Sequence, residues 1–174
     1  MPETLRETLT TQLATAWGLA SYHLQGLTDA ECHWRPAQRG MHVWPVEPQR
    51  WRADWPDHEA YDLGPPSIAW TTWHMIFWWS TALNRNFGDG ELARQDVIWP
   101  GSADGVRTRL GELHAAWASH LCGLADADLV LGRQGAWPYS EASLAKVFAW
   151  ANIELTKNAA ELGYGRFLFA VQAG

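Results

Sequence analysis

The chain has 174 residues, of which 47% are hydrophobic and 18% charged, so it can enclose one core of ordinary domain size and is not disordered. Its formal net charge of −6 opposes a nucleic-acid backbone, and no apolar run exceeds five residues, far short of a membrane span. We therefore expect a single domain over residues 1–174, with neither nucleic-acid nor membrane partners. The absence of an export leader and the presence of only two cysteines favour the cytoplasm.

Residues 5–25 show the period of an amphipathic helix. Apolar side chains recur there at steps of four and three, at Leu5, Leu9, Leu13, Trp17, Ala20 and Leu24. Thr4 and Glu7 have the spacing of a capping box, in which each side chain bonds a free backbone N–H at the helix start. A helix is therefore predicted from Leu5 to about Gln25.

Residues 36–66 form a long loop that is rich in proline and tryptophan. Six prolines interrupt the segment, and no helical period survives between them. Trp44, Trp51 and Trp55 lie in it, and their large rings favour burial. We expect this loop to fold back over one end of the domain. No clear strand alternation is found anywhere in the chain.

Residues 67–87 predict a second helix that is apolar nearly all round. Pro65 and Pro66 precede it, and Gly88 is a natural residue to follow its end. A helix of this kind is buried on most sides, either inside a bundle or against a second subunit. Because a bundle covers only part of each helix, this breadth favours a homodimer.

Two further helices complete the predicted fold. One runs from Ala103 to Cys122 with Ser102 as its cap, and the other follows Ser140 and continues to about Phe169. Four amphipathic helices in one domain predict an all-α, antiparallel four-helix bundle.

Polar residues interrupt the apolar face of the last predicted helix. Glu154 and Asn158 are four residues apart and lie one turn apart on one face, with Lys157 beside them. His74 lies within the apolar second helix. Groups of this kind inside a bundle need hydrogen-bond partners, water or a metal ion.

The functional interpretation places a divalent cation between these two helices. His74, Glu154 and Asn158 supply nitrogen and oxygen ligands that suit Zn, Ni, Mn or Fe, and Lys157 and Glu161 would orient them. Open positions on such an ion could polarise a substrate. Two alternatives stay open: a buried hydrogen-bond network without metal, and a Glu154 side chain that points outward.

The other histidines and the cysteines carry weaker signals. His114 and His120 lie off the apolar line of residues 103–122, which favours solvated surface, whereas His42 and His58 could complete a site at the mouth of the bundle. Neither Cys32 nor Cys122 has the surroundings of a nucleophile.

Three segments resemble the DinB-like (YfiT-like) superfamily. Residues 67–76, ending in Trp73-His74-Met75-Ile76, resemble its second-helix motif, in which a His follows a short apolar lead. Residues 152–163 are similar to its fourth-helix motif, usually His-x-x-x-His followed by a small residue, a Gln and a Gly. Residues 27–36 are similar to the turn that closes its first helix.

The resemblance implies a four-helix bundle in up-down-down-up order, often dimeric. Many members hold a metal through three histidines, and some are transferases or isomerases that use a thiol cofactor. In this chain His74 matches a ligand position, whereas Glu154 and Asn158 stand at the two helix-four positions and Glu161 replaces the usual Gln.

Two functions follow from this comparison of motifs. One is a metal-dependent enzyme, a transferase, isomerase or hydrolase, that acts on a small molecule, with a thiol cofactor by analogy alone. The alternative is a non-catalytic small-molecule-binding or dimerisation module with a degenerate metal site. Its pocket would be lined by Trp70, Trp73 and Trp78.

Overall fold

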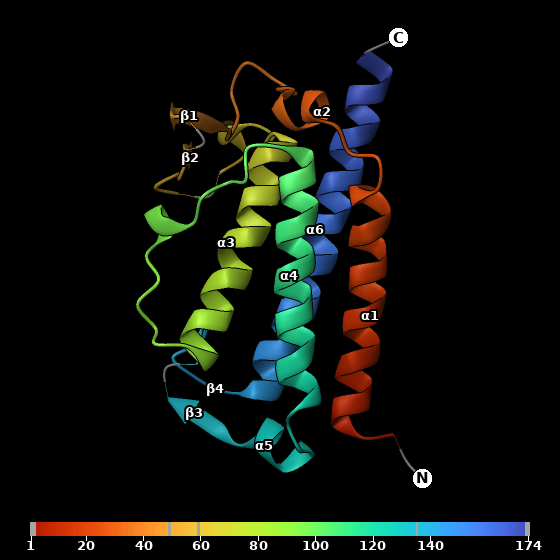
Figure 1. Cartoon of the computed structure of the whole chain (residues 1–174), viewed down its shortest axis with the longest axis vertical. Helices are drawn as coiled ribbons and strands as arrows, with labels where there is room; N and C mark the ends of the chain where they lie inside the picture. The colour runs from red at the N-terminus through yellow and green to blue at the C-terminus, as the bar shows by residue number, and fades with distance from the viewer. Residues whose placement is uncertain (1–2, 49, 59, 135, 173–174) are drawn as a thin grey trace.

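The fold is mostly helical. The computed structural model describes residues 3–48, 50–58, 60–134 and 136–172. Its four long helices are α1 (Leu5–Leu24), α3 (Ile68–Phe87), α4 (Ala103–Cys122) and α6 (Leu144–Gln172). In Figure 1, α1 and α6 run in one direction along the bundle, and α3 and α4 run in the other. Shorter elements join them: α2 (Asp29–His33), α5 (Asp126–Val130) and the 3₁₀ turns η1 (Tyr61–Leu63) and η2 (Arg94–Asp96).

Local capping sets where the helices begin. The Thr4 side chain accepts a hydrogen bond from the Glu7 N–H, and the Glu7 carboxylate accepts one from the Thr4 N–H, as a capping box requires. Ser67 caps α3 in a similar way. The predicted cap at Ser140 is wrong: α6 begins at Leu144, and the Ser143 hydroxyl accepts from the Lys146 N–H at 3.4 Å.

Among the described residues, the strands form two small antiparallel pairs that the sequence did not indicate. β1 (Val43–Glu47) pairs antiparallel with β2 (Arg50–Ala53), and β3 (Gly132–Gln134) pairs antiparallel with β4 (Glu141–Ser143). The longest of these strands has five residues, and its register is irregular between Pro45 and Glu47. Such short, mostly exposed strands have no sustained alternation of apolar and polar residues, so periodicity does not reveal them.

Most of the apolar side chains around α3 are covered by other parts of the same chain. The ring of Trp55 packs edge-on against Trp73 and Phe77, with ring centroids 6.2 and 5.3 Å apart. The Trp73 indole donates to the Val97 carbonyl at 2.8 Å, which holds the connection between α3 and α4 against the helix. The apolar breadth of this helix is therefore accounted for within one chain, and the homodimer stays a prediction.

The hairpin that follows α2 is tied to the start of α3 through Asp54. The Asp54 carboxylate accepts from the His42 backbone N–H at 2.8 Å and from the Trp44 indole at 3.0 Å. Its backbone carbonyl accepts from the Trp70 indole at 2.8 Å. Figure 1 shows β1 and β2 beside the N-terminal end of α3. The Trp70 indole of α3 thus holds this segment against the bundle, and the Trp44 indole ties the segment to itself.

Helices α1 and α6 pack side by side along most of their length. The Asn152 amide donates to the Leu9 carbonyl at 3.2 Å, near the beginning of α1. Near its end, the His23 ring lies so close to Gly163 that a Cβ there would be 2.5 Å from a ring carbon. Glycine at 163 therefore allows the close approach of the two helices.

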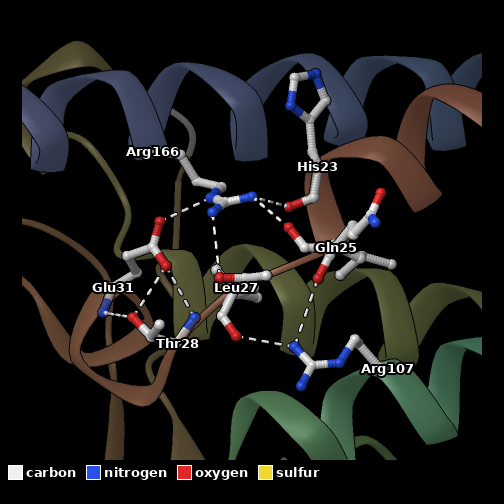
Figure 2. Close-up of polar contacts among 9 residues, drawn as sticks. His23, Gln25, Leu27, Thr28, Glu31, Arg107 and Arg166 are labelled. Atoms are coloured by element: carbon white, nitrogen blue, oxygen red, sulfur yellow. Dashed lines mark hydrogen bonds and ion pairs between the residues drawn. The ribbon is translucent and has the colours of Figure 1, made fainter.

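One arginine from α6 closes the end of the bundle at which α1 stops. Figure 2 shows the Arg166 guanidinium between the C-terminal turn of α1 and the start of α2. It donates to the carbonyls of His23 and Gln25 at 2.8 and 2.9 Å and to the Glu31 carboxylate at 2.7 Å. Arg107 of α4 donates to the Leu27 carbonyl at 2.8 Å. These bonds satisfy carbonyls that a helix end leaves free.

Within the described residues, no helix combines the length and the hydropathy that crossing a bilayer requires.

Candidate functional site

His74 lies on α3 and is partly buried by other side chains. The imidazole stacks on the Trp70 indole, with ring centroids 4.9 Å apart and planes tilted by 10°. Its Nδ1 atom is buried and has no hydrogen-bond partner. Burial, assisted by the positive charge of Lys157, lowers the pKa of His74 to about 4. The ring is therefore neutral at pH 7, with one ring nitrogen unpaired.

Glu154 and Lys157 form an ion pair on α6. The Lys157 Nζ atom lies 2.8 Å from a Glu154 carboxylate oxygen, and the two residues are one helical turn apart. The Glu154 side chain is 20% exposed, so it neither points fully outward nor lies fully inside. Since the charge of Lys157 acts on both Glu154 and His74, this lysine connects the α6 part of the site with α3.

Asn158 is fully buried between α3 and α6, with both ends of its amide bonded. Its Oδ1 atom accepts from the Trp78 indole N–H at 2.8 Å, and its Nδ2 atom donates to the Glu161 carboxylate at 3.0 Å. The distinct donor and acceptor partners fix the orientation of the amide. Trp78 lies one turn after His74 on α3, so this bond holds the two helices together beside His74.

The predicted residues thus form two linked groups. Lys157 contacts Glu154, and Glu161 contacts Asn158, so both residues expected to orient ligands do touch the predicted ligands. Within the described chain, no hydrogen bond or ion pair joins His74 to Glu154 or Asn158.

The cluster as it stands does not supply three free ligands for a metal ion. Among the residues that the structure describes, no group of three or more His, Cys, Asp or Glu side chains is arranged to hold one. The Asn158 oxygen already accepts from Trp78, so one of its two lone pairs is used, and an amide oxygen is a weaker ligand than an imidazole nitrogen. His74 and Glu154 remain, whereas catalytic zinc sites have three protein ligands.

The three tryptophans expected to line a pocket are core residues in this chain. Trp70, Trp73 and Trp78 are at most 8% exposed. Each indole N–H donates to another part of the chain, at Asp54, Val97 and Asn158 respectively. Their contacts are those of residues that tie loops and helices to α3.

A groove with a volume of about 630 Å³ lies between α1 and α6. Lys157 is one of its lining residues, so the groove borders the polar cluster. The other residues on its walls are Thr11, Gln12, Thr15, Ala16, Leu19, Ala149, Asn152, Ile153 and Thr156.

A second polar contact lies at the mouth of the bundle. The His42 Nδ1 and Ser67 Oγ atoms are 2.6 Å apart, and both side chains are buried. Burial lowers the pKa of His42, with a smaller contribution from His33. Ser67 also caps α3, so a structural role accounts for the contact. His58, by contrast, is exposed near Asp62.

The expectation of a solvated His114 is wrong in part. Its ring stacks on Trp17 with centroids 4.3 Å apart and is partly buried, which lowers its pKa. His120 is exposed and stacks on Phe87 at 4.0 Å. The helical stripe of α4 does not reveal these contacts, because the rings that cover the histidines come from other helices.

This geometry defines a class of protein. It is a mostly helical bundle with a polar cluster between its second and last long helices. A model of the DinB superfamily matches residues 12–162, which is most of the chain, and the chain belongs to that superfamily. The superfamily is generally metal-binding. A search of the curated proteins and a search of the solved structures each found no match.

Proposed function

We propose that this chain is a non-catalytic binding or dimerisation module, in which a hydrogen-bonded polar cluster takes the place of the superfamily's metal centre. The observation that carries the proposal is the Asn158 amide, whose oxygen and nitrogen are both bonded to protein, to Trp78 and to Glu161. Turning the amide so that its oxygen points away from Trp78 toward a cation would leave a buried indole N–H without an acceptor, which costs about 1–3 kcal/mol.

Two further features support the proposal. The Glu154 carboxylate is neutralised by Lys157 within its own helix, so its charge does not require a cation. The helix directions in Figure 1 support the superfamily's up-down-down-up order in one domain, which places α3 against α6 at the cluster. A small-molecule ligand and a cytoplasmic location remain part of this proposal.

The second candidate function is a metal-dependent enzyme, as most of the superfamily would suggest. The specific observation in its favour is the buried, unpaired Nδ1 atom of a neutral His74, because a metal ligand must be a neutral imidazole with a free nitrogen. In this version, Zn, Ni, Mn or Fe would be held by His74, Glu154 and Asn158. A thiol cofactor is part of this candidate by family analogy alone.

Metal binding separates the two candidates. Untagged protein is purified, its metal content is measured, and it is then titrated with ZnCl₂, NiCl₂ and MnCl₂, and with FeCl₂ under anaerobic conditions, in a calorimeter. The wild-type chain is compared with His74→Ala and with the double variant Glu154→His, Asn158→His, which restores histidine at both helix-four positions of the resembling motif.

We expect the wild-type chain to hold clearly less than one equivalent of metal and the double variant to bind one equivalent. His74→Ala should then not change the metal content of the otherwise wild-type chain. One equivalent of metal in the wild-type chain that is lost in His74→Ala would overturn the proposal and establish the metal site.

A further inference from the structure

The groove between α1 and α6 has the size of a small-molecule site. Its volume of about 630 Å³ falls within the range that is usual for such sites. On α1 its lining extends from Thr11 to Leu19, which is roughly 12 Å of helix. An extended peptide of four residues already spans about 13 Å, so the length of the groove favours a small molecule over a segment of another protein.

The walls of this groove are mainly apolar. Leu19 and Ile153 are 46% and 67% exposed and supply much of the apolar surface. The hydroxyl groups of Thr15 and Thr156 donate to main-chain carbonyls one turn earlier in their own helices, at 3.0 and 2.8 Å. These threonines can therefore offer a ligand methyl groups and oxygen lone pairs, but no O–H donor.

Asn152 gives the groove an acceptor without a partner. The side chain is 4% exposed, and its Nδ2 atom donates to the Leu9 carbonyl at 3.2 Å and to the Gln12 Oε1 atom at 3.4 Å. Because both partners are oxygens, they fix which end of the amide is the nitrogen. The Oδ1 atom is buried and has no hydrogen-bond partner in the part of the chain that the structure describes. A ligand with an N–H group would complete this amide.

Lys157 gives the groove a donor nearer to the solvent. Its side chain is 47% exposed, and its Nζ atom pairs with Glu154, which lies one turn earlier on α6. The ammonium group thus reaches back along the helix in the direction of Asn152. Glu154 uses one of its three N–H groups, so the others can donate to a ligand.

We propose that the groove between α1 and α6 binds a small, neutral secondary amide that carries an aliphatic group on each side. In a trans amide the N–H and the C=O point to opposite sides. The N–H meets the buried Asn152 oxygen, the C=O accepts from the more exposed Lys157, and the aliphatic groups lie against Leu19 and Ile153. The exposed Gln12 side chain, which makes the longer of the two bonds to Asn152, moves aside to admit the ligand.

This inference deepens the proposed binding function by naming a ligand class, and it rests on that function for the premise that the ligand is held without being transformed. Charge disfavours two other simple ligands. A carboxylate would lie beside Glu154 in a chain whose formal net charge is already −6. A ligand with an ammonium group would bring a second positive charge to Lys157.

A matched pair of ligands tests the hydrogen bond to Asn152. Isotope-labelled wild-type protein is titrated with N-butylbutanamide and, separately, with butyl butanoate, in which an ester oxygen replaces the N–H. The titrations contain EDTA and are followed by NMR. We expect the amide to shift signals of residues 11–19 and 149–157, among them the Asn152 side-chain amide, and the ester to bind about fivefold more weakly or less. Sodium octanoate, an anion of similar size, should also bind more weakly than the amide.

Two variants with the same new residue test the location. Ile153→Glu places a charge on the apolar wall and should weaken binding of the amide at least about fivefold. Tyr164→Glu is the matched control, because Tyr164 is also on α6, is 65% exposed and is not a lining residue of the groove. Its affinity for the amide should equal that of the wild-type protein.

Asn152→Leu removes the acceptor at similar size, so the amide should lose its advantage over the ester. The comparison of the two ligands on the wild-type chain does not depend on the folding of this variant.

Four results would overturn the inference. They are no shift with the amide, shifts confined to other parts of the chain, an ester or octanoate that binds as tightly as the amide, and an Ile153→Glu variant that keeps wild-type affinity. The metal measurements decide the proposed function separately. A chain without metal that ignores the amide overturns this inference alone, whereas a chain that holds one equivalent of metal and still binds the amide overturns the proposed function alone.

Discussion

At the scale of single residues, the site is defined by how its polar atoms are paired. Asn158 has both ends of its amide bonded, whereas His74 has an unpaired Nδ1 atom and a pKa lowered to about 4. One residue is therefore held in a fixed orientation, and the other has bonding capacity left. This difference indicates that Asn158 has a structural role and that His74 is the member of the cluster whose ring nitrogen can still bind another group.

The lowered pKa of His74 predicts a loss of stability in acid. The unfolded chain takes up a proton as the pH falls through about 6.5, but the folded ring does so only near pH 4, so acid favours unfolding. Between about pH 7.5 and about pH 5 we expect this group to lower the unfolding free energy by about 2 kcal/mol. Above pH 7.5 it should have no effect.

Urea unfolding at the two pH values measures this change. His74→Gln is the control, since it lacks the titrating ring but keeps the other acid-sensitive groups. If wild-type and His74→Gln proteins lose equal stability on acidification, the ring is not buried in its neutral form.

Removal of the Asn158 amide should destabilise the fold. Asn158→Ala leaves the Trp78 indole N–H without its acceptor and creates a small cavity, so we expect a loss of about 2–3 kcal/mol. Lys157→Ala is the neighbouring control, and because its ion pair is partly exposed it should cost less than about 1 kcal/mol. Urea titration of both variants gives the comparison, and equal losses would contradict the role assigned to Asn158.

At the scale of the elements, the arginine shown in Figure 2 joins three helices at one end of the bundle. Arg166 belongs to α6, the carbonyls that it binds belong to the end of α1, and Glu31 belongs to α2. Burial alone would raise the pKa of Glu31, but hydrogen bonds from Arg166 and Thr28 outweigh it and lower that pKa. The Glu31 carboxylate is therefore charged, and its negative charge is stabilised by Arg166.

Arg166→Ala should accordingly cost about 3 kcal/mol of unfolding free energy, because Glu31 and two helix-end carbonyls lose their partner together. Arg166→Lys should recover part of this loss, since an ammonium group keeps the charge but not the planar fork. Arg109→Ala, at a more exposed pair with Glu112, is the control and should change stability by less than about 1 kcal/mol. Thermal and urea unfolding measure all three variants.

Three of the four long helices were predictable because each has a local signal at its start. The predicted range 103–122 agrees with α4, the capping box at Thr4 places the start of α1, and α3 begins directly after Ser67. The start of α6 was not predictable in this way, because residues 141–143 pair with β3 before the helix begins. That pairing is tertiary information, and a serine at 140 resembles a cap just as well as a serine at 143.

The polar cluster was only partly predictable. Helical spacing places Glu154, Lys157 and Asn158 together, but it cannot show that the Trp78 indole bonds Asn158 from another helix. The resembling motif contains a glycine at position 163. The physical reason for it, the close contact with the His23 ring, is visible only in the structure. The exposed residues of α6 could have been found from the sequence, since their regular spacing continues as far as Val171.

At the scale of the whole molecule, the fold is stabilised by packing and hydrogen bonds of the chain itself. The interior contains fully buried tryptophans at 79, 99 and 117, and the Trp99 indole donates to the Thr72 hydroxyl of α3 at 3.0 Å. Such a core stabilises the bundle through buried apolar surface and internal hydrogen bonds.

We therefore expect the unfolding midpoint of the wild-type chain to be unchanged by EDTA or by added ZnCl₂. The Glu154→His, Asn158→His variant should instead gain stability with zinc, because an ion that binds only the folded state shifts the equilibrium toward it. Thermal unfolding with and without each additive measures both effects. A clear rise of the wild-type midpoint with zinc would count against the metal-independent cluster.

The clamp made by Arg166 also has a consequence for biosynthesis. The carbonyls that it binds are at residues 23 and 25, and Arg166 is translated about 140 positions later. These two hydrogen bonds at the end of α1 therefore form only after most of the chain has been made. While the ribosome is still adding the last helix, α1 has neither this arginine nor the Asn152 contact at its other end. The nascent bundle is thus completed late, and until then the apolar face of its first helix is not covered by α6.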